Sequence, residues 1–164
     1  NQAIFARHAL SQVSLQYVIS ADYDATAIDK FITQSDPNEL KKVVPAYFDF
    51  ARGAWFPESK DRASRLRCDV AVALAVTHHL CLDQGYSFEY VFSVFAQYTN
   101  HYLIVEYMPF GLWDGNQDPV KTPSWYSEEN FIIALSEKFT ILDRKQLEPH
   151  RICYVAELKE QLVS

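Results

Sequence analysis

The sequence predicts an α/β fold with a doubly wound, mostly parallel sheet and an antiparallel strand pair at its C-terminal end. Segments of strand composition alternate with segments of helical periodicity, and strands in such an order pair in parallel through right-handed crossovers. The runs 70–76 and 102–105 are continuously apolar, as in strands that are covered on both faces. The last two strand-like segments, "KFTILDRKQL" and "RICYVAEL", are joined by the short loop "EPH", which predicts antiparallel pairing.

The first part of the chain is expected to contain two helices and two strands. A helix near Ile4 is predicted by apolar residues that share one face, and Asp24 is placed to cap a second helix. Strands are predicted within 14–22 and 43–50, which carry β-branched and aromatic side chains and end near an acidic residue. The segment 51–67 is predicted to be a loop with one helical turn.

The second part of the chain continues the alternation of strands and helices. A strand is predicted over 69–77, and a helix with apolar residues at helical spacing follows the turn residue Gly85. The next strand is predicted over 101–108, and a turn-rich insert, 109–126, follows it and could form part of an acceptor lid. Ser127 is placed to cap the last helix before the closing strand pair.

Length and composition limit the class of protein. A chain of 164 residues with 49% hydrophobic content is expected to form one domain, 1–164. The net charge of −6 and the absence of a basic run make nucleic acid an unlikely partner. The three cysteines lack metal-ligand spacing and are expected to be reduced thiols. No segment has the length of a membrane span or the pattern of a signal peptide, so the expected location is the cytoplasm.

Acidic residues stand at the ends of the first two predicted strands. Asp22 could accept hydrogen bonds from both hydroxyls of a ribose, and Asp49 could accept one from an adenine amino group. The aromatic residues that follow them, Tyr23 and Phe50, could hold a purine between apolar surfaces. Each aspartate could instead be an ordinary helix-capping or turn residue, and the residues alone leave this open.

A polar cluster follows the apolar run of the strand 69–77. Thr77, His78 and His79 would lie at the carboxyl end of a central strand, where ligands bind in sheets of this kind. Two adjacent histidines on an extended strand point to opposite sides, so they are not expected to share a metal ion. One of them could act as a general base or bind a substrate, or both could be structural. Glu106, near the end of the next strand, is either a pocket carboxylate or a buried pairing partner.

The order of these segments resembles a known family. The segments are "YVISADYDATAID", "VPAYFDF", "CDVAVALAVTHHL", "HYLIVEYMPFG", "SEENFIIALSEKFTILDRKQL" and "RICYVAEL". Together they resemble the later motifs of class I S-adenosylmethionine-dependent methyltransferases, which have a Rossmann-like fold. The resemblance implies that Asp22 binds the cofactor ribose, that Asp49 lies by the adenine, and that the segment from Thr77 to His79 lines the methyl-transfer site. It also implies cofactor contacts for Asn1, Tyr23, Phe50 and Thr77, and makes His78 and His79 the candidate catalytic residues.

One departure from the family concerns the first strand and its glycine-rich loop. The sequence has no glycine before Gly53, and its beginning is similar to the helix that should follow that loop. We therefore expect an N-terminally incomplete domain that lacks its first strand, with Asn1 near the end of the loop. Two strands beside the missing one would expose hydrogen-bonding edges, which makes a homo-oligomer possible.

Two classes of function follow from these observations. The first is methyl transfer from S-adenosylmethionine to a small-molecule or protein acceptor, which depends chiefly on proximity and orientation. The alternative is a non-catalytic, methyltransferase-like module that binds a partner protein. An oxidoreductase with a dinucleotide site is disfavoured because the sequence contains no G-x-G-x-x-G motif.

Overall fold

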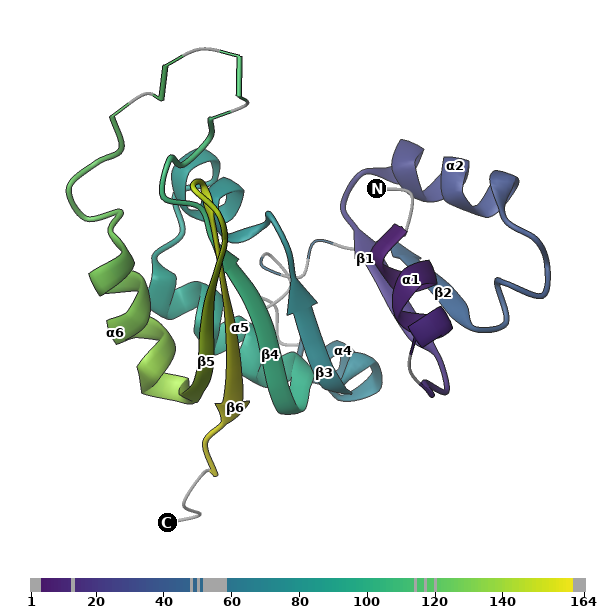
Figure 1. Ribbon diagram of the computed structural model, residues 1–164. Coiled ribbons are helices and arrows are strands. Elements are labelled where there is room, and N and C mark those ends of the chain that lie inside the picture. The colour runs from purple at the N-terminus through teal and green to yellow at the C-terminus, as the bar shows by residue number, and fades with distance from the viewer. Residues whose placement is uncertain are drawn as a thin grey trace. The chain divides into compact units, whose positions relative to one another are not determined.

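The chain forms two compact units, Asn1–Ser59 and Lys60–Ser164 (Figure 1). The computed structural model describes residues 4–12, 14–47, 49, 51, 59–113, 115–116, 118–119 and 121–160. Each unit is described by itself below. The expectation of a single domain over 1–164 stays a prediction.

The first unit is a small parallel pair of strands with two helices. Its elements are α1 (Ile4–Gln12), β1 (Val18–Asp22), α2 (Ala25–Gln34) and β2 (Val43–Tyr47). β1 and β2 run parallel, as the alternation of strand and helix predicts, with Val18 opposite Val43. The strands are shorter than the predicted ranges, but the order and type of all four elements are confirmed.

Local capping and a small core explain the fold of this unit. Asp24 caps α2, as predicted, because its side chain accepts a hydrogen bond from the Thr26 backbone nitrogen at 2.9 Å. Ala6 of α1, Phe31 of α2 and Val43 of β2 form the buried cluster that holds the helices on the strands. The core is small, so the unit depends on a few apolar contacts.

The second unit contains a four-stranded mixed sheet in the order β3-β4-β6-β5. Its elements are α4 (Ser59–Leu66), β3 (Cys68–Ala73), the π-helix η1 (His79–Asp83), α5 (Phe88–Tyr98), β4 (Thr99–Tyr107), α6 (Glu128–Lys138), β5 (Phe139–Glu148) and β6 (Arg151–Leu158). β3 and β4 are parallel, whereas β6 is antiparallel to both β4 and β5. The predicted antiparallel C-terminal pair is therefore confirmed, within a sheet that is mixed.

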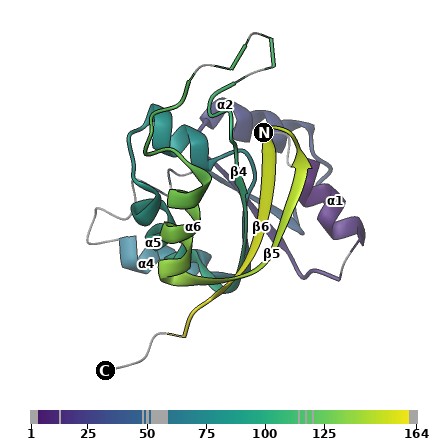
Figure 2. The ribbon, with the colours of Figure 1, turned by 60° about the vertical axis from the view of Figure 1, so that its left-hand side comes forward.

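Helices α5 and α6 pack on one face of this sheet and on each other (Figure 2). β6 alternates buried and half-buried residues, as expected for a strand with one face on a helical layer. Phe92 of α5, Phe131 of α6 and Tyr154 of β6 are fully buried, and the Phe131 ring lies 5.0 Å from Phe92 and 5.2 Å from Tyr154. These aromatic contacts form the centre of the core.

That the run 70–76 is covered on both faces stays a prediction, because the second unit by itself covers one face of β3. Val70 and Val72 point to the face opposite the α5–α6 layer, where they stay 41% and 38% exposed. Ala73, on the other face, is buried. Within the second unit, β3 is therefore covered on the face that packs against α5.

The strand predicted over 69–77 ends earlier, at Ala73. Ala75 adopts a left-handed backbone conformation with φ 52°, and its backbone nitrogen donates a hydrogen bond to the Glu106 carboxylate at 2.8 Å. This bond stabilises a turn that leads into η1. His78 and His79 therefore lie in helical backbone rather than on an extended strand, and their rings are 4.1 Å apart instead of on opposite sides.

The segment predicted to be a loop, 51–67, contains more helix than expected. The α4 helix covers eight residues at its end. Among the described residues, no helix is long and apolar enough to cross a membrane.

Candidate functional site

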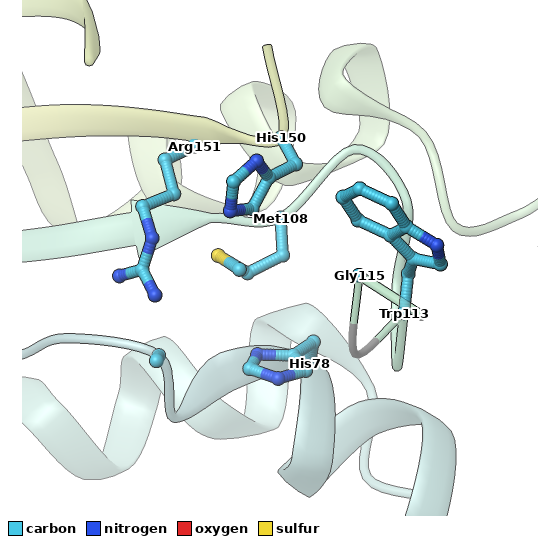
Figure 3. A pocket seen from close by; sticks show the side chains of 7 residues that line it. His78, Met108, Trp113, Gly115, His150 and Arg151 are labelled. Atoms are coloured by element: carbon cyan, nitrogen blue, oxygen red, sulfur yellow. The ribbon is translucent and has the colours of Figure 1, made fainter. Parts of the chain in front are cut away.

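A cavity of about 420 Å³ lies where β3, β4 and the β5–β6 hairpin end. Figure 3 shows His150 and Arg151 on one side of this cavity, His78 on the opposite side and Met108 between them. The described residues that line it are Ala75, His78, Met108, Trp113, Gly115, His150 and Arg151. Its place at the carboxyl ends of two parallel strands is the place where the sequence analysis expected a ligand.

His78 is the most deeply buried titratable residue of the lining. Its exposed fraction is 5%, and its Nδ1 atom has no hydrogen-bond partner among the described residues. The pKa of His78 is lowered to about 4, chiefly by burial and then by the neighbouring His79 and Arg151, with Asp83 opposing them. The imidazole is therefore neutral near pH 7 and can offer one donor and one acceptor nitrogen.

His79, the other candidate catalytic residue, lies in a different environment. Its side chain is 54% exposed, and its Nδ1 is 2.7 Å from an Asp83 carboxylate oxygen, one turn further along η1. It is not among the residues that line the cavity. The structure thus distinguishes the two histidines, between which the sequence left the choice open.

Glu106, in β4, is bonded to the turn after β3 and to the start of β6, the two other segments around the cavity. It is 3% exposed, and one of its carboxylate oxygens accepts the hydrogen bond from the Ala75 nitrogen. The same carboxylate pairs with Arg151 Nη1 at 3.0 and 3.3 Å. Of the two alternatives for Glu106, the buried pairing partner is confirmed, and the pairing fixes one wall of the cavity.

Thr77 is fully buried, and its hydroxyl donates a hydrogen bond to the Glu106 backbone oxygen at 2.6 Å. This bond ties the turn after β3 to the end of β4. It uses the hydroxyl proton, so a cofactor contact through this hydroxyl would have to use its oxygen as an acceptor.

His150 and Arg151 are site residues that the sequence analysis did not single out. The antiparallel register of β4 and β6 places Tyr107 opposite Ile152, which brings the start of β6 beside the carboxyl end of β4. His150 Nε2 lies 3.1 Å from a Glu148 oxygen, and its ring meets Trp113 edge-on at 5.3 Å. The predicted hairpin could have revealed both residues, because it returns the chain to the ligand end of the sheet.

The remaining predicted site residues belong to the first unit. Asp22 is half-buried at the end of β1, and one of its oxygens accepts a hydrogen bond from the Asp24 nitrogen at 3.0 Å. This is the turn contact that the sequence left open beside the ribose role. Tyr23 is 65% exposed and Asp49 is half-buried, whereas Asn1 and Phe50 lie outside the described residues.

Metal binding finds no support in the part of the chain that the structure describes. No group of three or more His, Cys, Asp and Glu side chains there could hold a metal ion. Cys68, Cys81 and Cys153 are free thiols, and burial raises the pKa of Cys81 to about 12. A buried thiol of this kind is an unreactive core residue.

Comparison with solved structures shows the fold of class I S-adenosylmethionine-dependent methyltransferases over most of the chain. Fibrillarin, a pre-rRNA processing protein of Methanococcus jannaschii, matches 88% of this chain and 57% of its own, with a TM-score of 0.60 and 14% identity. Magnesium protoporphyrin IX methyltransferase from Synechocystis, solved with bound S-adenosylmethionine, matches 94% and 64%, with a TM-score of 0.59 and 12% identity.

The N-methyltransferase NodS from Bradyrhizobium japonicum matches 97% of this chain and 81% of its own, with a TM-score of 0.61 and 12% identity. This chain spans 57% of the length of the fibrillarin and 64% of the length of the magnesium protoporphyrin IX methyltransferase. No protein-family model and no curated protein sequence matches it. The likeness therefore lies in the fold.

Proposed function

We propose that this chain is part of an enzyme that transfers a methyl group from S-adenosylmethionine to an acceptor bound in the cavity beside His78. The observation that carries the proposal is the cavity at the carboxyl ends of β3 and β4, in a chain with the fold of these methyltransferases. In open α/β sheets, ligands bind at this end of the strands.

Three of the proposed cofactor residues lie at or just after the strands of the first unit. Asp22 would accept hydrogen bonds from the ribose hydroxyls, and Asp49 would lie by the adenine amino group. Tyr23 offers an exposed ring against which a purine could pack. Asn1, Phe50 and Thr77 complete the proposed set.

The contribution of the protein to such a reaction is positioning. The cofactor supplies an activated methyl group, and the acceptor atom must approach the methyl carbon opposite the sulfur. Glu106 would hold the walls of the cavity through Ala75 and Arg151, and neutral His78 would form a hydrogen bond with the acceptor. His79, which is exposed and paired with Asp83, would have the smaller role.

Calorimetric titration with S-adenosylhomocysteine tests the proposal. Saturable binding that is lost in Asp22→Ala would support a cofactor site at β1. Asp29→Ala, an exposed aspartate on the nearby helix α2, is the matched control and should bind normally. Because these 164 residues contain no glycine-rich loop before Gly53, the same titration is made on any longer chain that the gene encodes. Failure of both chains to bind would contradict the proposal.

The second candidate is a non-catalytic module that binds a partner protein. The apolar side chains of Val70 and Val72, which the second unit by itself leaves uncovered, favour it, because uncovered apolar surface marks an interface. Two results together would support this alternative. The native chain would bind no S-adenosylhomocysteine, and Val70→Ser would lose the self-association or partner binding that the native chain shows. Cofactor binding without any such interaction would support the enzyme.

A further inference from the structure

We propose that the methyl acceptor is a small molecule with a carboxylate group, bound by Arg151 and His78, and that its product is a methyl ester. The inference rests on the proposed methyltransferase function and adds the chemical class of the acceptor. It follows from the polar groups of the cavity, from their charge and from the volume available.

Nitrogen groups that can donate hydrogen bonds dominate the polar side chains of the described lining. They are the guanidinium of Arg151, the imidazoles of His78 and His150 and the indole of Trp113, and the described lining residues include no side-chain carboxylate and no hydroxyl. Figure 3 shows these side chains on both sides of the cavity. A ligand in this space is therefore offered donors, which an acceptor with oxygen atoms and no polar hydrogen can satisfy.

Arg151 keeps donor capacity for a ligand. Its Nη1 pairs with the Glu106 carboxylate, and its Nε lies 3.7 Å from a Glu148 oxygen. Its Nη2 makes no hydrogen bond to any described residue, although the side chain is only 34% exposed. A guanidinium held in place on one side is preorganised to bind an oxyanion on the other.

Glu106 also adjusts how strongly the site would hold an anion. A carboxylate loses negative charge as it attacks a methyl group, so a strongly cationic site would stabilise the ground state more than the transition state. The buried Glu106 offsets the charge of Arg151 but leaves its directional hydrogen bonds. Such a guanidinium can orient a carboxylate without suppressing its reactivity.

The state of His78 fits an acceptor that is already ionised. Because burial lowers the pKa of His78 to about 4, this imidazole is a weak base near pH 7. An ammonium or alcohol acceptor must lose a proton, whereas a carboxylate is ionised at this pH. Neutral His78 can donate one hydrogen bond to the second carboxylate oxygen.

The proposed step balances without a base. A carboxylate oxygen forms a bond to the methyl carbon while the bond between that carbon and the sulfonium sulfur breaks, and the electron pair of that bond stays on the sulfur. The negative and positive charges cancel, which leaves a neutral ester and a neutral thioether, and no proton is transferred.

The size and the apolar residues of the cavity indicate the rest of the acceptor. A volume of about 420 Å³ lies in the range for small-molecule sites. The Met108 side chain lies between the two polar sides, and Trp113 stands at one end (Figure 3). These side chains would pack against an apolar group that carries the carboxylate.

Binding of simple carboxylates tests the acceptor class without the cofactor. Acetate, hexanoate and benzoate are titrated against the protein by calorimetry, beside the matching amides, which have the same shape and no charge. We expect at least one carboxylate to bind about tenfold more tightly than its amide, because hydrogen bonds to an ionised partner are stronger. The preference should disappear in Arg151→Lys, which keeps a charge for Glu106 but loses the second nitrogen of the fork.

Arg144→Lys is the matched control. Arg144 pairs with Glu128 on the surface, away from the cavity lining, so this variant should keep the preference for the carboxylate. Thermal unfolding of both variants shows whether they fold. His78→Gln, which can still donate a hydrogen bond, should keep most of the preference, whereas His78→Leu should lose part of it.

The chemical nature of the product gives an independent test. The protein is incubated with methyl-labelled S-adenosylmethionine and the small-molecule fraction of an extract, and the labelled product is treated with alkali. Methyl esters release volatile methanol under these conditions, whereas methyl ethers and methylamines do not. Release of most of the label would support the inference.

The outcomes separate this inference from the proposed function. Binding of S-adenosylhomocysteine, with equal affinity for carboxylates and amides or with an alkali-stable product, would overturn the carboxylate acceptor and leave the methyltransferase intact. No binding of S-adenosylhomocysteine would overturn both.

Discussion

His78 shows how burial changes the chemistry of a single residue. The residue is predicted to couple folding stability to pH, because its folded pKa of about 4 lies below the ordinary value of 6.5. As pH falls below about 6.5, the unfolded chain binds the proton first, so stability decreases until the pH reaches about 4. The groups that face His78 and adjust this behaviour are His79, Asp83 and Arg151.

Between pH 6.5 and 4, we expect the protonation of His78 to lower the free energy of unfolding by about 2 kcal/mol, after allowance for solvent in the open cavity. Urea unfolding at several pH values measures it as the difference between the native chain and His78→Gln. His101→Gln, at an exposed histidine, is the control and should follow the native chain. Equal pH dependence in the native chain and His78→Gln would show that the imidazole is not desolvated.

Glu106 is predicted to be the most sensitive charged residue of the site. Removing its carboxylate in Glu106→Ala leaves Arg151 without its close partner and the Ala75 turn without its acceptor. We expect a loss of about 2 to 3 kcal/mol in the free energy of unfolding, because the pair is largely buried. Glu148→Ala, at a half-exposed partner of the same arginine, should cost less than about 1 kcal/mol. Similar losses in urea unfolding of the two variants would contradict this assignment.

At the scale of the elements, α6 depends on its N-terminal cap. The Ser127 side chain accepts a hydrogen bond from the Asn130 backbone nitrogen at 3.2 Å, and two glutamates occupy the first turn. Ser127→Ala is expected to lower the free energy of unfolding by about 1 kcal/mol. Ser136→Ala, in the last turn of the same helix, should be neutral or slightly stabilising because alanine has the higher helix propensity. Chemical denaturation of both variants measures the difference, and a costlier Ser136→Ala would contradict it.

The end of β3 is the element that differs most from its sequence pattern. Apolar residues continue through Val76, so periodicity alone extends the strand to residue 77. The strand ends at Ala73 because Glu106, more than thirty residues away in sequence, accepts the Ala75 nitrogen and supports a turn. A contact of this kind is invisible to any local rule, and it moves His78 into the cavity.

At the scale of the whole molecule, cofactor binding should appear as stability. A ligand that binds only the folded state, at 100 times its dissociation constant, stabilises that state by about 2.7 kcal/mol. We expect thermal unfolding with S-adenosylhomocysteine to shift upward by a matching amount. Asp22→Asn should lose the shift, and Asp29→Asn should keep it. A shift that persists in Asp22→Asn would place the ribose contact elsewhere.

The sequence by itself determined the order and type of the main elements, because helix caps and hydrophobic periodicity are local signals. Asp24 and Ser127 begin helices where they were expected to, and the closing strands pair antiparallel. The site was determined only in part. His78 and His79 were both candidates, and the sequence did not indicate which of them lines the cavity.

Only the tertiary structure decided which side chains meet at the cavity. His150 and Arg151 reach it through the register of β6 on β4, and Glu106 becomes a buried partner through contacts with two distant segments. These pairings depend on burial and on long-range geometry. Sequence spacing specifies neither the burial of a side chain nor its distance from remote segments, because both are determined only when the chain folds.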